Sequence, residues 1–529
     1  MTPVDLEWGA FHEAAPWVLD RDQLRWRAVA DRMRRHAAAE VPVLVAPGRL
    51  PPGGRAITVV ATLGRHLLPW ARSRRHATSA ASRADISRRL RLAAQRLGPT
   101  YIKLAQIISS GEGLFPTELV AELKLCRDRV PPEPFRRVRS VVERDLGRTL
   151  EEVFETFDPE PLAAASIAQV HAATLRTGEP VVVKVQRPQV GRVVRRDLRA
   201  MSWLAPHLVG RIQVASLANP PALVELFAET VMEELDFRIE AANMLDIATM
   251  LRNVGQDSYV VPRPHPTLVT RRVLVMERLD GFNFDDVEGM QAAGVDTEQV
   301  VRTAMISLME GAMVEGVFHG DLHGGNLFVL PDGRTALLDF GIVGRLEHHR
   351  RLAFLRLMLG AMTNDPRGQM AAMRDLGALP ADTDIDAVVR DLRLDQPVVD
   401  PTSLTGEELV AELRRMISAL LGYGARMPKE LMLYVKDLVF IDGAIARLAP
   451  DLDMLAEIAE VSMLFAERHG ERLGRDLGID PSAMFDMANI DMDGVRAGFG
   501  LDPGTERLTY RELRARREVI QRRMKERPG

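Results

Sequence analysis

The chain has 529 residues, 46% of them hydrophobic and 27% charged, and its 69 basic and 73 acidic side chains give a formal charge of −4. This length exceeds one ordinary hydrophobic core and predicts several domains, while the apolar fraction excludes a disordered chain. A single cysteine, Cys126, excludes a disulfide framework and a cysteine-based zinc site.

The near-neutral charge is unevenly distributed along the chain. Residues 21–100 hold 17 Arg, no Lys and four acids, a local charge of +13, and residues 505–529 add +5. Helical spacing predicts an Arg-rich helix over Arg21–Glu40, a linker over Val41–Gly54 and an amphipathic helix over Ala56–Arg75. The amphipathic helix either packs on its own protein or lies against an anionic membrane surface. No nucleic-acid-binding motif accompanies the arginines, so nucleic acid is not an expected partner.

Charged residues interrupt every long apolar run, so no membrane-spanning helix is predicted. Residues Met1–Asp20 carry four acids and no Lys or Arg, which is unlike a signal peptide. We therefore expect a cytoplasmic protein, with peripheral attachment to a membrane left open.

Further helices are predicted before residue 150. Helical periodicity covers Ala84–Leu97, breaks at a glycine and restarts at Pro99, whose missing N–H is harmless in a first turn. On this second helix Lys103 and Gln106 are three residues apart and share a face. The segment Thr117–Asp128 predicts another helix.

Strand-like runs appear after residue 150. Val181–Val185 and Arg271–Met276 are rich in β-branched and aliphatic residues, and between them Leu223–Leu251 has helical periodicity with many acids. Leu327–Leu330 and Thr335–Leu338 flank a Pro-Asp-Gly turn and predict a hairpin. A small mixed lobe is therefore followed by a larger helical one.

The strongest local signal is HGDLHGGN at His319–Asn326, followed by the hairpin and then by Asp339-Phe340-Gly341. An aspartate, an asparagine five residues later and a second aspartate after the next hairpin are how protein kinases assemble a phosphoryl-transfer site. Magnesium prefers hard oxygen ligands, so Asn326 and Asp339 are the candidate metal ligands. Asp321 then remains to orient or deprotonate an acceptor hydroxyl or a water.

Two other metal sites are weaker interpretations. His319 and His323 are four residues apart, as in a zinc pair, but the glycines that follow oppose the helix such a pair needs. Asn489–Gly494 opens like a calcium-binding loop, but its twelfth position is Gly500 instead of a glutamate.

A kinase-like site also requires a lysine on an upstream strand and a glutamate on a helix that holds it. Val181–Lys184 supplies the lysine. An ammonium at the end of an apolar strand must face anions, because burying it without a partner costs free energy. The acidic helix supplies the glutamate within Glu234–Glu240. A lysine in a valine run is also typical of an edge strand, but the order of the four motifs favours the functional interpretation.

The segment Val273–Gly281 resembles the hinge between kinase lobes, whose backbone binds adenine. Met276 would line the adenine pocket, and Glu277 and Leu279 would offer main-chain groups. Where kinases place a glycine-rich loop over the phosphates, this chain has alanines, whose methyl groups restrict the approach of the backbone. The candidate phosphate-contacting residues are Ala163, Ala164, Ala165, Ser166 and Ala168.

These motifs together resemble the UbiB/AarF (ADCK) family of atypical kinase-like proteins, associated with isoprenoid-quinone biosynthesis. The resemblance extends from about residue 98 to about residue 379. It rests on the segments GPTYIK, VPP, FDPEP, AAASIAQVH, VVVKVQRP, ELDFRIEAAN, VLVMERLDG, HGDLHGGN and LLDFGIVGRL.

The resemblance implies roles for individual residues. Lys103 and Gln106 match the K-x-G-Q signature, whose helices cover the substrate site, and Glu234 and Asp236 match the E-x-D motif. The lysine–glutamate pair corresponds to Lys184 and Glu240, the catalytic aspartate to Asp321, and the metal ligands to Asn326 and Asp339. Two departures stand out: the signature glycine is Ala105, and HGDLHGGN lacks the two prolines of H-A-D-P-H-P-G-N.

The predicted fold is α+β and bilobal, like that of a protein kinase, with helical extensions at both ends. The expected enzyme is an atypical kinase or ATPase that binds ATP or ADP with Mg²⁺ and acts on a small or lipid-associated acceptor. Other expected partners are an anionic membrane, a lipid or isoprenoid, and a protein. The alternative function is a nucleotide-regulated lipid carrier or chaperone-like protein. The expected domains are an Arg-rich N-terminal region (1–81), a K-x-G-Q-like extension (82–150), an N-lobe (151–281), a C-lobe (282–470) and a helical tail (471–529).

Overall fold

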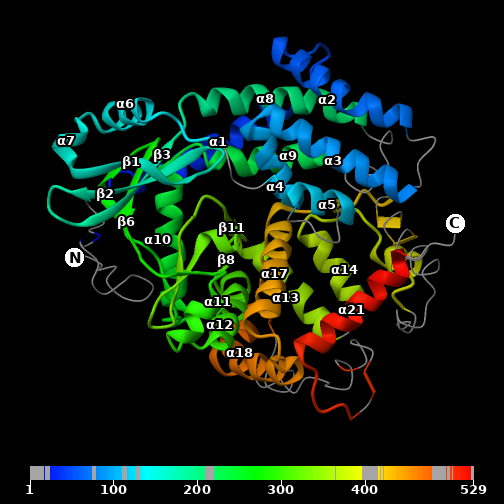
Figure 1. Ribbon diagram of the computed structural model, residues 1–529. Coiled ribbons are helices and arrows are strands. Elements are labelled where there is room, and N and C mark those ends of the chain that lie inside the picture. The colour runs from blue at the N-terminus through cyan, green and yellow to red at the C-terminus, as the bar shows by residue number, and fades with distance from the viewer. Residues whose placement is uncertain are drawn as a thin grey trace. The chain divides into compact units, whose positions relative to one another are not determined.

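The computed structural model forms two compact units (Figure 1). The first takes in the chain up to Asn283 together with Asp321–Leu330 and Arg334–Val343, and the second takes in Phe284–Gly320, Pro331–Gly333 and the chain from Gly344. The residues described are 17, 19, 24–73, 79–109, 116–126, 131–208, 220–363, 365–395, 415–416, 419–420, 422–478, 496, 501–502 and 504–525. The acidic turn at Asn489–Gly494 lies outside them. The α+β class that the sequence predicts is confirmed.

In the residues described, the first unit begins with five helices: α1 (Arg27–Val45), α2 (Gly53–Ser73), α3 (Ser79–Leu97), α4 (Pro99–Ser109) and α5 (Thr117–Lys124). The predicted linker starts too early, because α1 continues through Pro42 to its end at Val45. Proline removes one helical hydrogen bond, but Val41 and Leu44 are 3% and 1% exposed, so their burial holds the last turns in place. Helix α1 packs against α8, α9 and α10.

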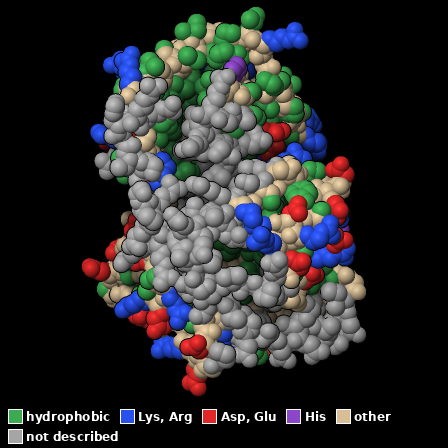
Figure 2. Space-filling model, turned by 90° about the vertical axis from the view of Figure 1, so that its right-hand side faces the viewer, with side chains coloured by type: hydrophobic (Ala, Val, Ile, Leu, Met, Phe, Trp, Pro, Cys, Tyr) green, Lys and Arg blue, Asp and Glu red, His purple; other side chains and the backbone are tan. Residues whose placement is uncertain are grey.

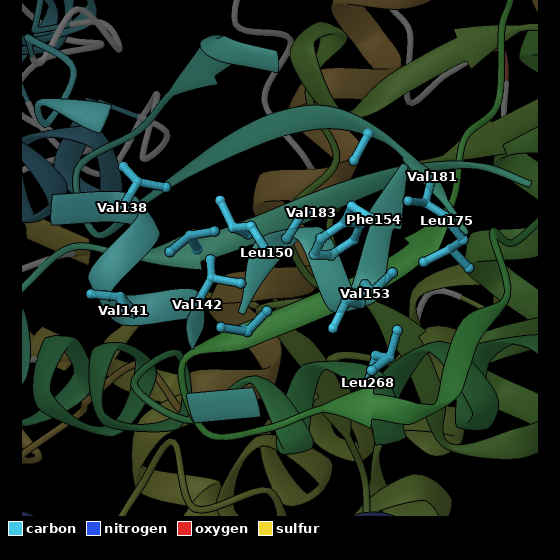
Figure 3. Packing of buried hydrophobic residues seen from close by; sticks show 14 residues of the cluster. Val138, Val141, Val142, Leu150, Val153, Phe154, Leu175, Val181, Val183 and Leu268 are labelled. Carbon is cyan, nitrogen blue, oxygen red and sulfur yellow. The ribbon is translucent and has the colours of Figure 1, made fainter. Parts of the chain in front are cut away.

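A five-stranded antiparallel sheet forms the centre of the first unit. Its order is β1 (Phe154–Ala164), β2 (Ala168–Leu175), β3 (Pro180–Gln186), β6 (Val273–Glu277) and β5 (Pro264–Val269). Side chains alternate between the faces of a strand, and Val181, Val183 and Val185 of β3 share one face. Figure 3 shows this face packing against valines of α6 (Phe135–Leu146) and against α7 (Leu150–Val153). Lys184 therefore points to the opposite face.

The acidic helical run is two helices, not one. It consists of α9 (Pro220–Glu233) and α10 (Phe237–Asn253), preceded by α8 (Val190–Leu204) and a 3₁₀ turn at Ala205–Leu208. Helix α10 begins anew because Asp236 caps it: its carboxylate accepts a hydrogen bond from the backbone N–H of Arg238 at 3.2 Å. The cap fixes where the first turn of α10, which carries Glu240, begins.

A second, four-stranded sheet in the same unit has the order β4 (Tyr259–Val260), β10 (Thr335–Leu337), β9 (Leu327–Val329) and β7 (Phe282–Asn283). The predicted hairpin is confirmed, with Leu327 opposite Leu337 and Val329 opposite Thr335. A Cβ at Gly281 would lie 2.8 Å from the carbonyl oxygen of Val329, so only glycine lets the chain pass this close to β9.

The second unit is mainly helical. It contains α11 (Val287–Ala292), α12 (Thr297–Met309), a π-helical turn (Glu310–Glu315), β8 (Val317–His319) paired with β11 (Val343–Arg345), α13 (His348–Met362), α14 (Pro366–Asp375), α15 (Ile385–Asp391), α17 (Lys429–Leu448), α18 (Met454–Leu477) and α21 (Tyr510–Lys525). None of the helices described is both long enough and apolar enough to span a bilayer.

Candidate functional site

Lys184 stands on β3 between two carboxylates. Its Nζ lies 2.5 Å from Oε1 of Glu240 on α10 and 3.0 Å from Oδ2 of Asp339. The side chains of Lys184 and Glu240 are 9% and 4% exposed, whereas Asp339 is 38% exposed. The structure thus brings together three residues that are widely separated in the sequence, and leaves one of the two carboxylates accessible.

The charges of this cluster depend on one another. Burial raises the pKa of Asp339, but the ammonium of Lys184 and the N–H of Gly341 outweigh it and lower that pKa to about 2. Burial lowers the pKa of Lys184, but Asp339 and Glu240 outweigh it, so the pKa lies above its usual value. Burial raises the pKa of Glu240 despite Lys184. At neutral pH an ammonium therefore faces a carboxylate that remains ionised.

Hydrogen bonds within the segment His319–Asn326 hold its fold. The side-chain Nδ2 of Asn326 donates to the carbonyl oxygen of Asp321 at 3.1 Å, and the N–H of Asn326 donates to the carbonyl of His323 at 2.9 Å. The ring Nδ1 of His323 accepts the N–H of Gly325 at 3.1 Å. The amide oxygen of Asn326 and the carboxylate of Asp339 are hard donors of the kind that suits Mg²⁺.

Lys103 enters the same electrostatic environment from α4. Its Nζ lies 3.0 Å from Oε1 of Glu234, with side chains 15% and 6% exposed. Burial lowers the pKa of Lys103, but Glu234, Asp321 and Asp339 together outweigh it and raise it above the usual value. Gln106 lies one turn later on α4 and is half-buried.

The two acids of the E-x-D pair have different surroundings. Glu234 pairs with Lys103, and burial raises the pKa of this carboxyl even though the lysine opposes it. Asp236 instead caps α10, and its Oδ2 pairs with the guanidinium of Arg238 at 2.6 Å. The structure therefore places Asp236 where it positions the helix that carries Glu240.

The alanine-rich segment forms the turn between β1 and β2. Its N–H at Ala165 donates to the carbonyl of Ala168 at 2.8 Å, and both Ser166 and Ala168 are buried. Of the other two predicted residues, Ala163 is exposed and Ala164 half-buried, at the end of β1.

Arg187 fixes this turn, a role that the sequence motifs do not reveal. The side chain is 7% exposed, and its Nε donates to the carbonyl of Ala165 at 2.9 Å. Its Nη1 donates to the carbonyl of Pro131 at 3.0 Å, and its own N–H donates to Ile167 at 2.9 Å. Arg187 lies in the segment VVVKVQRP, directly after the strand of Lys184, but this position does not indicate which carbonyls it binds.

Replacing the guanidinium should release the turn. We expect Arg187→Gln to lower the free energy of unfolding by about 1–3 kcal/mol, because the part-buried hydrogen bonds to the carbonyls of Ala165 and Pro131 lose their charged donor. Hydrogen exchange at the Ala165 amide should become faster, while Arg192→Gln, an exposed arginine on α8, should change neither. Unchanged exchange at Ala165 would show that Arg187 does not hold the turn.

The residues predicted to form the hinge lie at the end of β6 and beyond it. Met276 is 5% exposed and pairs with Val182 of β3. The N–H of Glu277 donates to the carbonyl of Arg263 at 2.9 Å, so this N–H is already engaged within the sheet. Burial raises the pKa of the Glu277 carboxyl to about 7, although the N–H of Arg263, which donates to this carboxylate, acts to lower it. Leu279 follows in the turn and packs against the four-stranded sheet.

Comparison with known proteins agrees with this architecture. The ABC1 atypical kinase-like domain matches residues 125–373. An uncharacterised protein of Mycobacterium tuberculosis is 35% identical over 372 residues, which cover 68% of this chain and 74% of the relative. An aarF domain-containing protein kinase of Arabidopsis thaliana chloroplasts is 34% identical (70% and 73% covered), and a probable protein kinase UbiB of Marinobacter nauticus is 33% identical (70% and 68%). The chain therefore belongs to the UbiB/AarF family of ABC1 atypical kinase-like proteins.

Proposed function

We propose that the protein binds ATP or ADP with Mg²⁺ and either hydrolyses ATP or transfers its phosphoryl group to a small or lipid-associated acceptor. The observation that carries this proposal is the contact of Lys184 with both Glu240 and Asp339. A buried ammonium held by one carboxylate and facing a second, accessible one is suited to binding phosphate oxygens beside a metal. Because relatives are named as probable UbiB kinases, we place the reaction in isoprenoid-quinone or lipid metabolism.

Each residue of the cluster has a role in this proposal. Lys184, oriented by Glu240, contacts the nucleotide phosphates. Asn326 and Asp339 hold Mg²⁺, which when bound neutralises charge on the phosphates. Asp321 orients the acceptor hydroxyl or water and accepts its proton.

The surrounding residues shape the site. The alanine-rich turn, residues 163–168, covers the phosphates, and Met276, the carbonyl of Glu277 and Leu279 line the adenine pocket. Lys103 and Gln106 on α4 limit access to the site, with Lys103 anchored on Glu234. Asp236 acts on Glu240 by capping α10.

Binding and turnover can be measured separately. Isothermal titration with ADP should show binding that strengthens when MgCl₂ is added, and ATP should release phosphate in the presence of magnesium. Binding without any turnover, with or without lipid vesicles, would contradict the catalytic part of the proposal and favour a carrier. No binding of either nucleotide would contradict all of it.

Helix α2 supports peripheral attachment to an anionic membrane. Its Ala56 and Val59 are each 1% exposed and pack inward, whereas Ile57, Val60 and Leu68 are 67%, 45% and 56% exposed. Helical spacing puts these three on one face, beside the exposed Arg65 and Arg72. Figure 2 shows hydrophobic side chains with Lys and Arg near them at the top of that view, at the level where Figure 1 draws α2 and α8. An apolar face bordered by arginines matches an interface with anionic lipid.

Removing the apolar face should reduce membrane binding. We expect the protein to sediment with phosphatidylglycerol vesicles more than with phosphatidylcholine vesicles, and the double variant Ile57→Gln/Leu68→Gln to bind about tenfold less, since two large apolar side chains are lost. A matched control is Val193→Gln on α8, where the side chain is 38% exposed. Equal binding of the double variant and the control would exclude α2 as the docking surface.

A further inference from the structure

Phe340, next to the metal-ligand candidate Asp339, has both of its main-chain groups held by α10. Its carbonyl oxygen accepts Nδ2 of Asn243 at 2.8 Å, and its N–H faces Oε1 of Glu240 at 3.5 Å. Glu240 and Asn243 are three residues apart and share a face of α10. The side chain of Phe340 is fully buried. Helix α10 thus contacts both peptide groups that flank the Cα of Phe340, the one that follows Asp339 and the one that precedes Gly341.

The amide of Asn243 must be turned in one direction to do this. An asparagine carries a donor and an acceptor on the same fork, and only the nitrogen can bind a carbonyl oxygen. Asn243 is 2% exposed, and its Oδ1 accepts Nη2 of Arg34 at 2.7 Å. Because a guanidinium can only donate, it requires the amide oxygen on its own side and leaves the nitrogen facing Phe340.

Arg34 belongs to α1, and two carboxylates fix its guanidinium. Asp31 on the same helix lies 2.7 Å from Nη1, and Asp246 on α10 lies 3.2 Å from Nη2. Two helical turns earlier, Arg27 also reaches α10, with Asp246 at 2.5 Å and the carbonyl of Ala242 at 3.2 Å. Two arginines of α1 therefore dock on α10. Arg34 is the one that donates a hydrogen bond to Asn243, whereas Arg27 binds Asp246 and the carbonyl of Ala242.

We propose that Arg34 is a positioning residue for the catalytic centre: it orients the amide of Asn243, which holds the Phe340 peptide and thereby the carboxylate of Asp339. Helix α1 precedes the stretch that matches the kinase-like domain. The N-terminal extension then contributes, through Arg34, to the geometry of the site. The effect on nucleotide binding rests on the proposed function, whereas the effect on the Phe340 peptide does not.

The test compares two arginines on one helix. Arg34→Gln should accelerate hydrogen exchange of the Phe340–Val343 amides in nucleotide-free protein about tenfold, the loss expected for a hydrogen bond to a charged donor. It should also weaken binding of ADP with MgCl₂ by a similar factor. Arg27→Gln, which loosens the same pair of helices without touching Asn243, should leave exchange in Phe340–Val343 unchanged.

A double-mutant cycle completes the test. If Arg34 acts through Asn243, the effect of Arg34→Gln on exchange should vanish in an Asn243→Ala background. Equal effects of Arg34→Gln and Arg27→Gln, or simple additivity with Asn243→Ala, would overturn the proposal. If Arg34→Gln does not fold, Arg34→Lys retains the charge beside Asp246 but lacks the planar fork, and the same comparison applies. A wild-type protein that binds no nucleotide would contradict the proposed function and leave the exchange result to decide this inference.

Discussion

Asp339→Asn should reduce magnesium-dependent ATP turnover by about 100- to 1,000-fold, the loss typical when one charge-stabilising group is removed from a catalytic centre. The substitution keeps the size of the side chain and removes the charge that faces Lys184 at 3.0 Å. It also removes the more accessible of the two carboxylates around that lysine. Lys184 keeps Glu240 as its partner, so the variant should remain folded.

The measurement is phosphate release at increasing MgCl₂, with ADP binding followed in parallel. Asp257→Asn provides the control, since this aspartate is exposed on the loop before β4. Binding of ADP should lose its dependence on magnesium in Asp339→Asn but not in Asp257→Asn. Retention of both magnesium dependence and turnover in Asp339→Asn would remove the basis for the metal site.

Lys103→Met should destabilise the first unit by about 3–5 kcal/mol at pH 8, the cost of leaving one charge of a buried pair without its partner. The charge left behind is Glu234, 6% exposed and 3.0 Å from the lost ammonium. Burial already raises the pKa of Glu234, and without Lys103 this pKa should rise further.

The direction of the pH dependence follows from that shift. A carboxyl with a raised pKa in the folded state binds a proton more readily when folded than when unfolded, so folding stability falls as pH rises through the folded-state pKa. The difference between Lys103→Met and wild type should therefore be larger at pH 8 than at pH 5.

Denaturant unfolding followed by tryptophan fluorescence measures this difference. All five tryptophans precede residue 204, within the first unit. The double variant Lys103→Met/Glu234→Gln should recover much of the loss, and Lys124→Met, at an exposed position on α5, should have little effect. A loss that is the same at both pH values would show that Glu234 is not left charged in the folded variant.

The sequence predicts those elements whose own residues carry the signal. The hairpin around Pro331-Asp332-Gly333 and the strand that carries Lys184 depend on turn chemistry and on a β-branched run, and both are where they were expected. Strand β1 was not predicted, because Pro159 and Pro161 oppose a strand. As the edge of its sheet, β1 can accommodate them, since an edge strand leaves backbone N–H groups unpaired.

The parts of the site that the sequence does not reveal depend on packing between distant segments. No local pattern pairs Arg187 with the carbonyl of Ala165, or Arg34 with Asn243, because each contact forms only when separate elements meet. Asp236 is the opposite case, because a sequence motif does include it, together with Glu234. Its position at the start of α10 nevertheless makes it the N-cap of that helix. Residue type and spacing thus indicate the chemistry, and tertiary packing determines which neighbour each group binds.

The double hold on the Phe340 peptide also bears on which inhibitors could act on this protein. Compounds that wedge into the space vacated when this phenylalanine swings outward require its ring to leave a fully buried position and its carbonyl to leave Asn243. Exposing an aromatic ring and abandoning a buried hydrogen bond both cost free energy. Ligands that leave the ring of Phe340 in its buried position should therefore bind more tightly than ligands that displace it. The adenine pocket that we propose is the better starting point for a chemical probe.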